Sequence, residues 1–258
     1  MKKKFHYFLS LLISFILLSC VGCVEVSPQI VFRVATEDEA FEYIIYQSKL
    51  LPYSKKHGYN ITLPKHEAFK KLYENPGASF DRQALKKIFV TEFYNKSSLE
   101  QRLKVAYNIK WVIEKALQKL AKLKKKWGFD VKQKYEIVFT PYGMDAIYQH
   151  SPELGKITFA ANSDIVRQPG GLEVTAIYEI VNIGIDNLVK RYNLGHWQRE
   201  RIIDLIIMFY LKDVVPYYVP VPLNEKKGDK RLDLFIDTEK AVEDLPAAIE
   251  KFKAHIEG

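Results

Sequence analysis

The chain has 258 residues and a net charge of +8 at pH 7, with 48% hydrophobic and 27% charged residues. This composition is typical of a globular protein and excludes an intrinsically disordered chain. Basic residues are not interleaved with aromatic ones in any stripe, so we expect no nucleic-acid partner. The length suits one large domain.

The first residues have the pattern of an export signal. Lys2-Lys3-Lys4 precede an apolar run from Phe8 to Leu18. A permanent membrane-spanning helix needs about 20 apolar residues, and this run is too short. A basic start followed by a short apolar segment predicts a signal peptide over residues 1–19.

Two cysteines follow the apolar run, and the sequence contains no others. Leu17-Leu18-Ser19-Cys20 resembles the lipobox of bacterial lipoproteins, in which the cysteine is acylated and becomes the mature N-terminus. The resemblance implies lipidation at Cys20, with Cys23 as the second choice, and a lipid-anchored location outside the cytoplasm. A secreted protein cut near this point and an uncleaved anchor are the alternatives. The lack of further cysteines excludes thiol catalysis and disulfides in the domain.

A tether over residues 20–35 is expected to lead into a helical half over residues 36–128. Thr36 and Glu39 form a capping box for the first helix, which we expect to end at Pro52. Two short helices should follow, starting at position 64 and position 81. The N-terminal half is therefore predicted to be helical and to support the C-terminal half of the domain.

The longest predicted helix begins at Ser97, which forms a second capping box with Glu100, and extends to Trp127. Its apolar residues recur every three or four positions, which predicts packing against a sheet. Its last turns carry a cluster of lysines, Lys115, Lys119, Lys122, Lys124, Lys125 and Lys126. A solvated helix end explains such a cluster, and contact with anionic lipid head groups is the alternative.

The hydrophobic pattern changes after residue 128. Tyr135–Phe139 and Lys156–Ala160 read as strands joined by a polar loop. Helices are then expected over 172–192 and 196–211, and a last helix over 238–255. Together these elements predict one α+β domain over residues 36–258, with a long helix in its N-terminal half and a small mixed or antiparallel sheet in residues 129–258.

The order of strand, turn, strand, long helix, short link and buried helix resembles the core of zincin metallopeptidases of the gluzincin type. Their HExxH motif would fall on Tyr178-Glu179-Ile180-Val181-Asn182. The resemblance implies that Lys156–Ala160 is the edge strand along which a substrate peptide lies. It also implies that Glu200 or Asp204 occupies the position of the third metal ligand.

This chain departs from the HExxH motif at the two positions that would bind the metal. A zinc site of this type needs two neutral imidazoles one helical turn apart. Tyr178 and Asn182 stand at those positions, and a protonated phenol and a carboxamide are poor ligands. Glu179 matches the general base, which would have no metal-bound water to activate. The resemblance therefore implies a domain without a metal cofactor and without peptidase activity, which could still bind an extended peptide or an envelope protein by strand addition.

Three alternatives stay open at this point. Tyr178 and Asn182 could be core residues of an unrelated helix, whose polar tips find partners. The chain could instead be an active zinc peptidase that uses Glu179, Glu200 or Asp204 together with His196. It could also be a purely structural envelope protein.

Asp204 lies within an apolar helix, so its carboxylate should be partly buried. A buried charge needs a partner, and we expect a structural ion pair with Arg199 or Arg201. His150, Asp145 and His196 share no metal-ligand spacing, so we expect them to be hydrogen-bonded structural residues.

Overall fold

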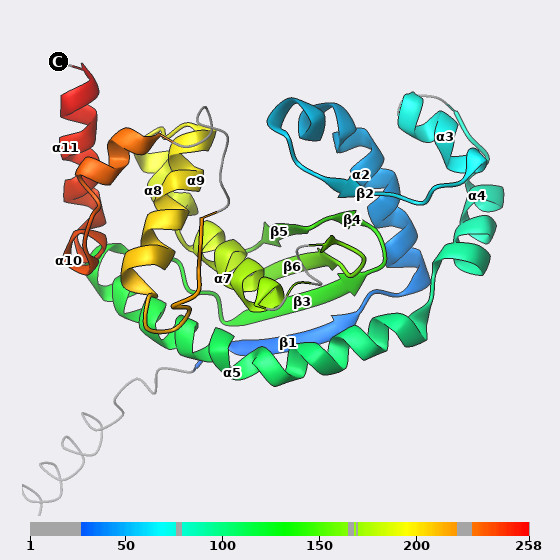
Figure 1. Ribbon diagram of the computed structural model, residues 1–258, viewed down its shortest axis with the longest axis horizontal. Helices are drawn as coiled ribbons and strands as arrows, with labels where there is room; N and C mark the ends of the chain where they lie inside the picture. Colours follow the sequence, from blue (N-terminus) through cyan, green and yellow to red (C-terminus); the bar gives the residue numbers. More distant parts are fainter. Residues whose placement is uncertain (1–26, 76–78, 165–167, 169, 221–228, 258) are drawn as a thin grey trace, which may run out of the picture.

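The computed structural model describes residues 27–75, 79–164, 168, 170–220 and 229–257 (Figure 1). The predicted signal peptide and the two candidate lipidation sites, Cys20 and Cys23, lie outside these residues. No helix within the described ranges is both long and apolar enough to cross a membrane.

A four-stranded mixed sheet in the order β1-β3-β6-β5 lies at the centre of the molecule. β1 (Gln29–Val34), β3 (Lys134–Thr140) and β6 (Leu154–Ala160) are parallel, and β5 (Ala146–His150) runs antiparallel to β6. The predicted α+β class is therefore confirmed.

The sheet corrects two expectations drawn from the sequence. Residues 29–34 were expected in a tether but form β1, because the alternating residues Ile30 and Phe32 are buried and pair alongside β3. The polar loop expected between the two predicted strands contains β5. Its last residues, Gln149 and His150, are exposed because β5 is an edge strand, so it has no continuous apolar pattern.

α2 (Glu37–His57) begins at the predicted capping box, in which Thr36 and Glu39 each accept a bond from the other's backbone. The expected end at Pro52 is wrong, since the helix continues to a left-handed cap at Gly58. Proline removes one backbone donor, and the following turn still closes through the bond from Tyr59 N–H to Ser54 O, at 2.9 Å.

The N-terminal half also contributes a strand. β2 (Ile61–Thr62) pairs with β4 (Gly143–Met144). The Tyr43 ring of α2 lies where a side chain at Gly143 would be, and φ at Gly143 is +135°. Only glycine fits this position, so Gly143 lets α2 pack closely on the sheet.

α5 (Lys96–Trp127) is the predicted long helix, and Asn95 rather than Ser97 caps it by accepting from Ser98 N–H at 2.9 Å. α5 packs against β1 and β3, and α7 (Gly171–Gly184) packs beside it against β5 and β6. The main hydrophobic core lies between these helices and the sheet.

The helix expected over 172–192 is divided into α7 and α8 (Asp186–Arg191). The carbonyl of Gly184 accepts from Asp130 N–H at 2.9 Å, and the Phe129 ring occupies the space of a Gly184 side chain. The break thus results from a contact with a distant segment, which the local sequence pattern does not encode.

The remaining elements form two arms that rise from the sheet (Figure 1). The N-terminal arm comprises α2, β2, α3 (Glu67–Glu74), α4 (Arg82–Ile88) and the π-helix η1 (Phe89–Phe93). The C-terminal arm comprises α8, α9 (His196–Leu205), the π-helix η2 (Ile206–Tyr210), the 3-10 helix η3 (Lys230–Leu234), α10 (Glu239–Glu243) and α11 (Leu245–Glu257).

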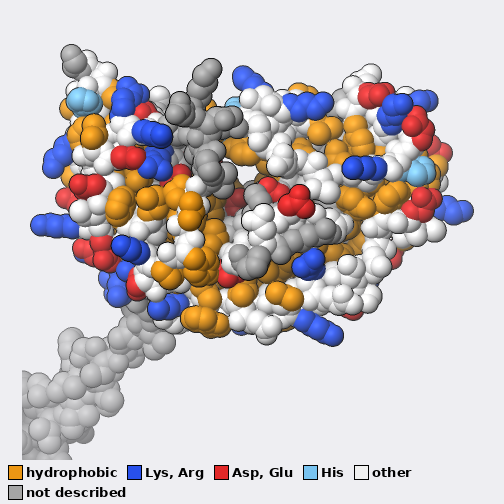
Figure 2. All heavy atoms as spheres, viewed as in Figure 1, with side chains coloured by type: hydrophobic (Ala, Val, Ile, Leu, Met, Phe, Trp, Pro, Cys, Tyr) orange, Lys and Arg blue, Asp and Glu red, His pale blue; other side chains and the backbone are white. Residues whose placement is uncertain are grey.

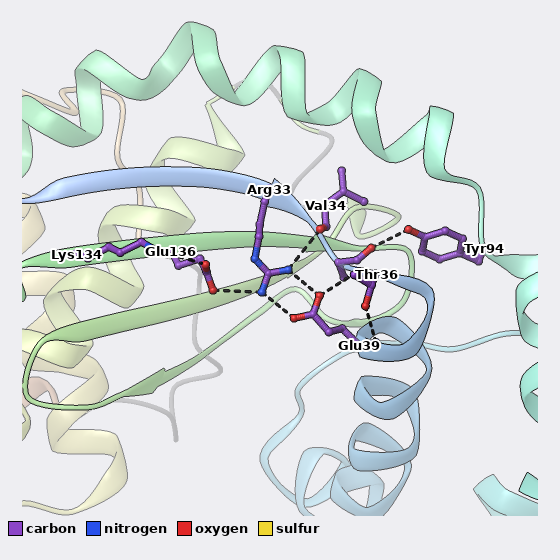
Figure 3. Close-up of polar contacts among 8 residues, drawn as sticks. Arg33, Val34, Thr36, Glu39, Tyr94, Lys134 and Glu136 are labelled. Carbon is purple, nitrogen blue, oxygen red and sulfur yellow. Dashed lines mark hydrogen bonds and ion pairs between the residues drawn. The ribbon is translucent and has the colours of Figure 1, made fainter.

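A polar corner joins the N-terminal arm to the sheet (Figure 3). The guanidinium of Arg33 on β1 donates to both carboxylate oxygens of Glu39 on α2, at 2.7 and 2.8 Å, and to Glu136 on β3 at 3.2 Å. Tyr94 donates to the carbonyl of Ala35 at 2.7 Å. These contacts fix the direction in which α2 leaves β1 and so position one wall of the site described below.

Candidate functional site

The residues singled out by the sequence meet where the helices α7 and α9 contact each other. The Tyr178 hydroxyl donates to Glu200 at 2.6 Å, and Arg199 donates to the side chain of Asn182. Tyr178 and Asn182 stand where the zincin motif would have its two histidines. Both therefore pair with residues of α9, the helix that was expected to carry the third metal ligand. We call the group Tyr178, Glu179, Asn182, Arg199 and Glu200 the polar seam.

Arg199 is the centre of the seam. Besides the Asn182 side chain, its guanidinium donates to the Asn182 carbonyl at 2.8 Å and pairs with Asp186 at 3.3 Å. Its carbon centre lies 5.5 Å from the ring centre of Tyr148 on β5, within cation–π range. Arg199 thus holds α7, the start of α8 and the edge strand together.

Glu179 is buried, with 9% of its surface exposed, and accepts one bond from the Asn182 side chain at 3.2 Å. Burial raises the pKa of Glu179 to about 7, the Asn182 bond opposes this shift, and the nearby Glu200 adds to it. Near neutral pH this carboxyl can both take up and release a proton. Strongly shifted pKa values are frequent among the residues of functional sites.

Asp204 is 3% exposed and accepts from Tyr218, and Arg201 lies 3.5 Å from its carboxylate. Burial raises its pKa, and the contacts with Tyr218 and Arg201 oppose that rise. The expected ion pair of Asp204 is confirmed for Arg201. Arg199, the other candidate, pairs with Asp186 instead.

The seam does not fit a zinc ion. Burial raises the pKa of the Tyr178 hydroxyl well above its usual value, so it remains a protonated donor to Glu200. The Asn182 oxygen accepts from a guanidinium, which brings a fixed positive charge to the second ligand position. Within the described residues, no three histidine, cysteine, aspartate or glutamate side chains are grouped so that they could hold a metal.

The three other candidate residues have separate partners. His150 faces Asp186 at 3.4 Å, Asp145 accepts from Ser163, and His196 shares a 2.6 Å hydrogen bond with Tyr59. Burial, His57 and Arg199 together lower the pKa of His196. All three are hydrogen-bonded or ion-paired, as expected, and His196 does not join Glu200 or Asp204.

The strand at the edge of the site is β5, not Lys156–Ala160, which belongs to β6 and lies between β3 and β5. No described strand pairs with the outer edge of β5. This edge lies below a hollow between the two arms, in which acidic side chains are visible (Figure 2).

An aromatic bridge connects the two arms. It consists of Tyr53, His57, Tyr59, His196 and Trp197. The ring centres of His57 on α2 and His196 on α9 are 5.3 Å apart, and those of His196 and Trp197 are 4.5 Å apart. The bridge therefore joins the end of α2 to the start of α9.

Sequence reasoning missed Arg199 as the organiser of the seam, along with Tyr148, Tyr59 and Asp186. One signal was available. Glu179, Asn182 and Asp186 are polar residues three and four positions apart in the helix expected over 172–192, a spacing that places them on one face. The contributions of Tyr59 and Tyr148 arise only from the tertiary fold.

No protein-family model, no curated protein and no solved structure matches this chain.

Proposed function

We propose that this chain is a lipid-anchored protein outside the cytoplasm that binds an extended peptide or envelope protein without cleaving it. The observation that carries the proposal is the outer edge of β5, with which no strand in the described part of the chain pairs and which lies beneath the hollow between the arms. An exposed strand edge offers rows of backbone N–H and C=O groups to an added strand.

The contacts of β5 support this role. Tyr148 and His150 are two positions apart on β5, so their side chains lie on the same face of the strand, the face on which α7 packs. There Tyr148 contacts Arg199, and His150 contacts Asp186. These contacts hold β5 from one face, while the hydrogen-bonding groups of its outer edge have no described strand partner. A rigid edge lowers the entropy lost on binding.

The seam supports binding without hydrolysis. The pKa of Glu179, about 7, would suit a general base. Tyr178 and Asn182, at the positions where the zincin motif has histidines, are instead hydrogen-bonded to Glu200 and Arg199. We infer that the domain derives from a zincin-like ancestor in which a guanidinium now supplies the positive charge beside the second ligand position. The lipid anchor rests on Cys20 and the sequence before it.

Hydrogen exchange tests the binding mode. A library of unstructured peptides is screened against residues 24–258, and the tightest binder is added to labelled protein. Alternate amides of β5 should become protected, because every second N–H of an edge strand points outward. The amides of β1, the opposite edge, serve as the control. Binding that leaves the β5 amides unchanged would contradict strand addition, and failure of all peptides to bind would favour a purely structural envelope protein.

Metal content tests the alternative of an active peptidase. About one equivalent of tightly held zinc in purified protein, together with peptide cleavage that a chelator abolishes, would refute the non-cleaving function. The zincin-like ancestry is tested separately by Tyr178→His with Asn182→His. We expect weak zinc binding while Arg199 remains, and much tighter binding when Arg199→Leu is added, with Glu200 as the third ligand. The same three substitutions with Glu200→Gln are the control. Equal zinc affinity of both would contradict the inferred ancestry.

Mass spectrometry of the mature N-terminus tests the anchor. A diacylglycerol-modified Cys20 is expected, and modification of Cys23 would move the cleavage site without changing the anchor. An unmodified mature N-terminus would refute the lipoprotein assignment.

A further inference from the structure

The outer face of α5 exposes two aromatic side chains, neither of which is buried in a hydrophobic core. Trp111 is 63% exposed and Tyr107 is 54% exposed, one helical turn apart. Exposed tryptophan at this level is unusual in a soluble domain, because its large apolar surface is costly to leave in water. Tyr107 also contacts Phe32 edge-on, with ring centres 5.5 Å apart, so this face adjoins β1.

Lysines share this face with the aromatic residues. Spacings of seven, four and seven residues place four side chains on one line along a helix of 3.6 residues per turn. These residues are Lys104, Trp111, Lys115 and Lys122, all exposed. Within the described ranges, no ion pair involves Lys104 or Lys122, whereas Lys119 and Lys126 pair with carboxylates of the C-terminal arm. Lys115, although exposed, also donates to the Asp213 carbonyl at 3.3 Å. Lys104 and Lys122 are therefore the lysines of this face for which no ion pair or side-chain hydrogen bond is found within the described residues.

We propose that this face, formed by Lys104, Tyr107, Trp111, Lys115 and Lys122, rests on the head groups of an anionic membrane. Tryptophan and tyrosine favour the boundary between head groups and hydrocarbon because their rings are both apolar and polar. Lysines near an anionic surface are attracted to it. The combination matches a lipid surface better than a protein interface, from whose core lysine is depleted.

The place where the described chain begins supports a membrane as the partner of this face of α5. β1 begins beside α5 (Figure 1), and the described chain starts at Ser27. Six residues separate Cys20 from Ser27, and the seven Cα-to-Cα steps between these two positions span at most about 25 Å when the chain is extended. An acyl group on Cys20, which rests on the proposed function, would therefore hold α5 near the bilayer. β1 and β5 are opposite edges of the sheet, so docking through α5 would turn the β5 edge away from the membrane.

Vesicle binding tests the proposal without the anchor. Both hydrophobic cores are formed by residues between Ile30 and Phe252, so residues 24–258 contain the whole described fold and lack both cysteines. We expect this protein to co-sediment with vesicles of phosphatidylglycerol and phosphatidylcholine, and much less with phosphatidylcholine alone. Brominated acyl chains should quench its tryptophan emission, and Trp111→Phe should remove that quenching.

Matched variants identify the surface. Trp111→Ala should weaken binding at least tenfold, whereas Leu234→Ala, which removes a 71% exposed side chain from the C-terminal arm, should not change it. Lys104→Gln with Lys122→Gln should weaken binding about fivefold per lysine, and Lys55→Gln with Lys56→Gln on the N-terminal arm is the control for charge. Circular dichroism confirms that each variant is folded.

Three outcomes would overturn the proposal: no vesicle binding, equal loss in the α5 variants and their controls, or self-association that buries Trp111 in the absence of lipid. The last outcome would assign this face to a second copy of the chain. None of these results depends on whether Cys20 is acylated, so failure here is distinguishable from failure of the proposed lipid anchor.

Discussion

The polar corner at β1 and the polar seam between α7 and α9 both place a glutamate near an arginine, with opposite results. At the corner, the pKa of Glu39 falls from 4.5 to about 2, chiefly because Arg33 donates to it. In the seam, the pKa of Glu179 rises from 4.5 to about 7 because the carboxyl is buried. The two sites differ in how many donors reach the carboxylate.

Glu39 accepts two bonds from Arg33 and a third from Thr36 N–H, at 2.9 Å. Among the described residues, Glu179 accepts one bond, from Asn182, since Arg199 donates to Asn182 and pairs with Asp186. A guanidinium therefore stabilises an ionised carboxylate where it contacts the carboxylate directly. The corner contributes to stability, and the seam holds a carboxyl that titrates near neutral pH at some cost to stability.

Removing the guanidinium from the seam should produce the largest effect. Arg199→Met would leave the oxygens of Asn182 and the carboxylate of Asp186 without this donor in a buried setting. Breaking one side of such a buried pair costs roughly 3–5 kcal/mol of unfolding free energy. Urea denaturation at pH 7 measures the loss.

Arg82→Met is the matched control for that substitution, because Arg82 pairs with Glu42 on the surface, where both side chains are more than half exposed. Surface ion pairs contribute roughly 0–1 kcal/mol. Equal destabilisation by the two substitutions would show that Arg199 does not organise the seam.

Glu179→Gln should stabilise the protein in a pH-dependent way. The folded-state pKa of Glu179 is raised, so the folded protein binds the proton more tightly than the unfolded chain does, and stability falls as pH rises from about 4.5 to 7. Glutamine removes that loss and can still accept from Asn182. We expect a gain of roughly 1–3 kcal/mol at pH 8 and little change at pH 4.

Glu153→Gln, at an exposed position, is the control for loss of one negative charge. Denaturation curves between pH 4 and pH 8 distinguish the two variants. A Glu179→Gln gain that is the same at every pH would show that the carboxyl stays in one protonation state across this range.

The sequence predicted the elements that local signals define. The capping box at Thr36, the long helix ending at Trp127 and the two strands at Tyr135–Phe139 and Lys156–Ala160 all occur in the structure. The errors occurred where distant segments decide the outcome. β1 is ordered by pairing with β3, and Gly184 ends α7 because its carbonyl bonds to Asp130.

The same distinction applies to the site. Helical spacing was enough to bring Tyr178 and Asn182 to one side of α7 and to predict an arginine beside Asp204. It could not show that Arg199 reaches Asn182, because that contact depends on how α9 crosses α7. Nor could it place β5 outside β6, since strand order is a property of the whole sheet.

Glu39→Gln should have the smallest effect and the opposite pH dependence to Glu179→Gln. The lowered folded-state pKa of Glu39 means that its ionised form stabilises the protein above about pH 4.5, and this contribution is lost as pH falls through about 2. Because the side chain is 38% exposed, solvent screens the pair, and we expect a loss of about 1 kcal/mol at pH 7. The loss should shrink steadily below pH 4 in urea denaturation. The same substitution at Glu67, whose pair with Lys70 is exposed, should have a smaller effect. A loss at Glu39 that persists unchanged at pH 2 would show that packing of the side chain, rather than its charge, holds α2 at the corner.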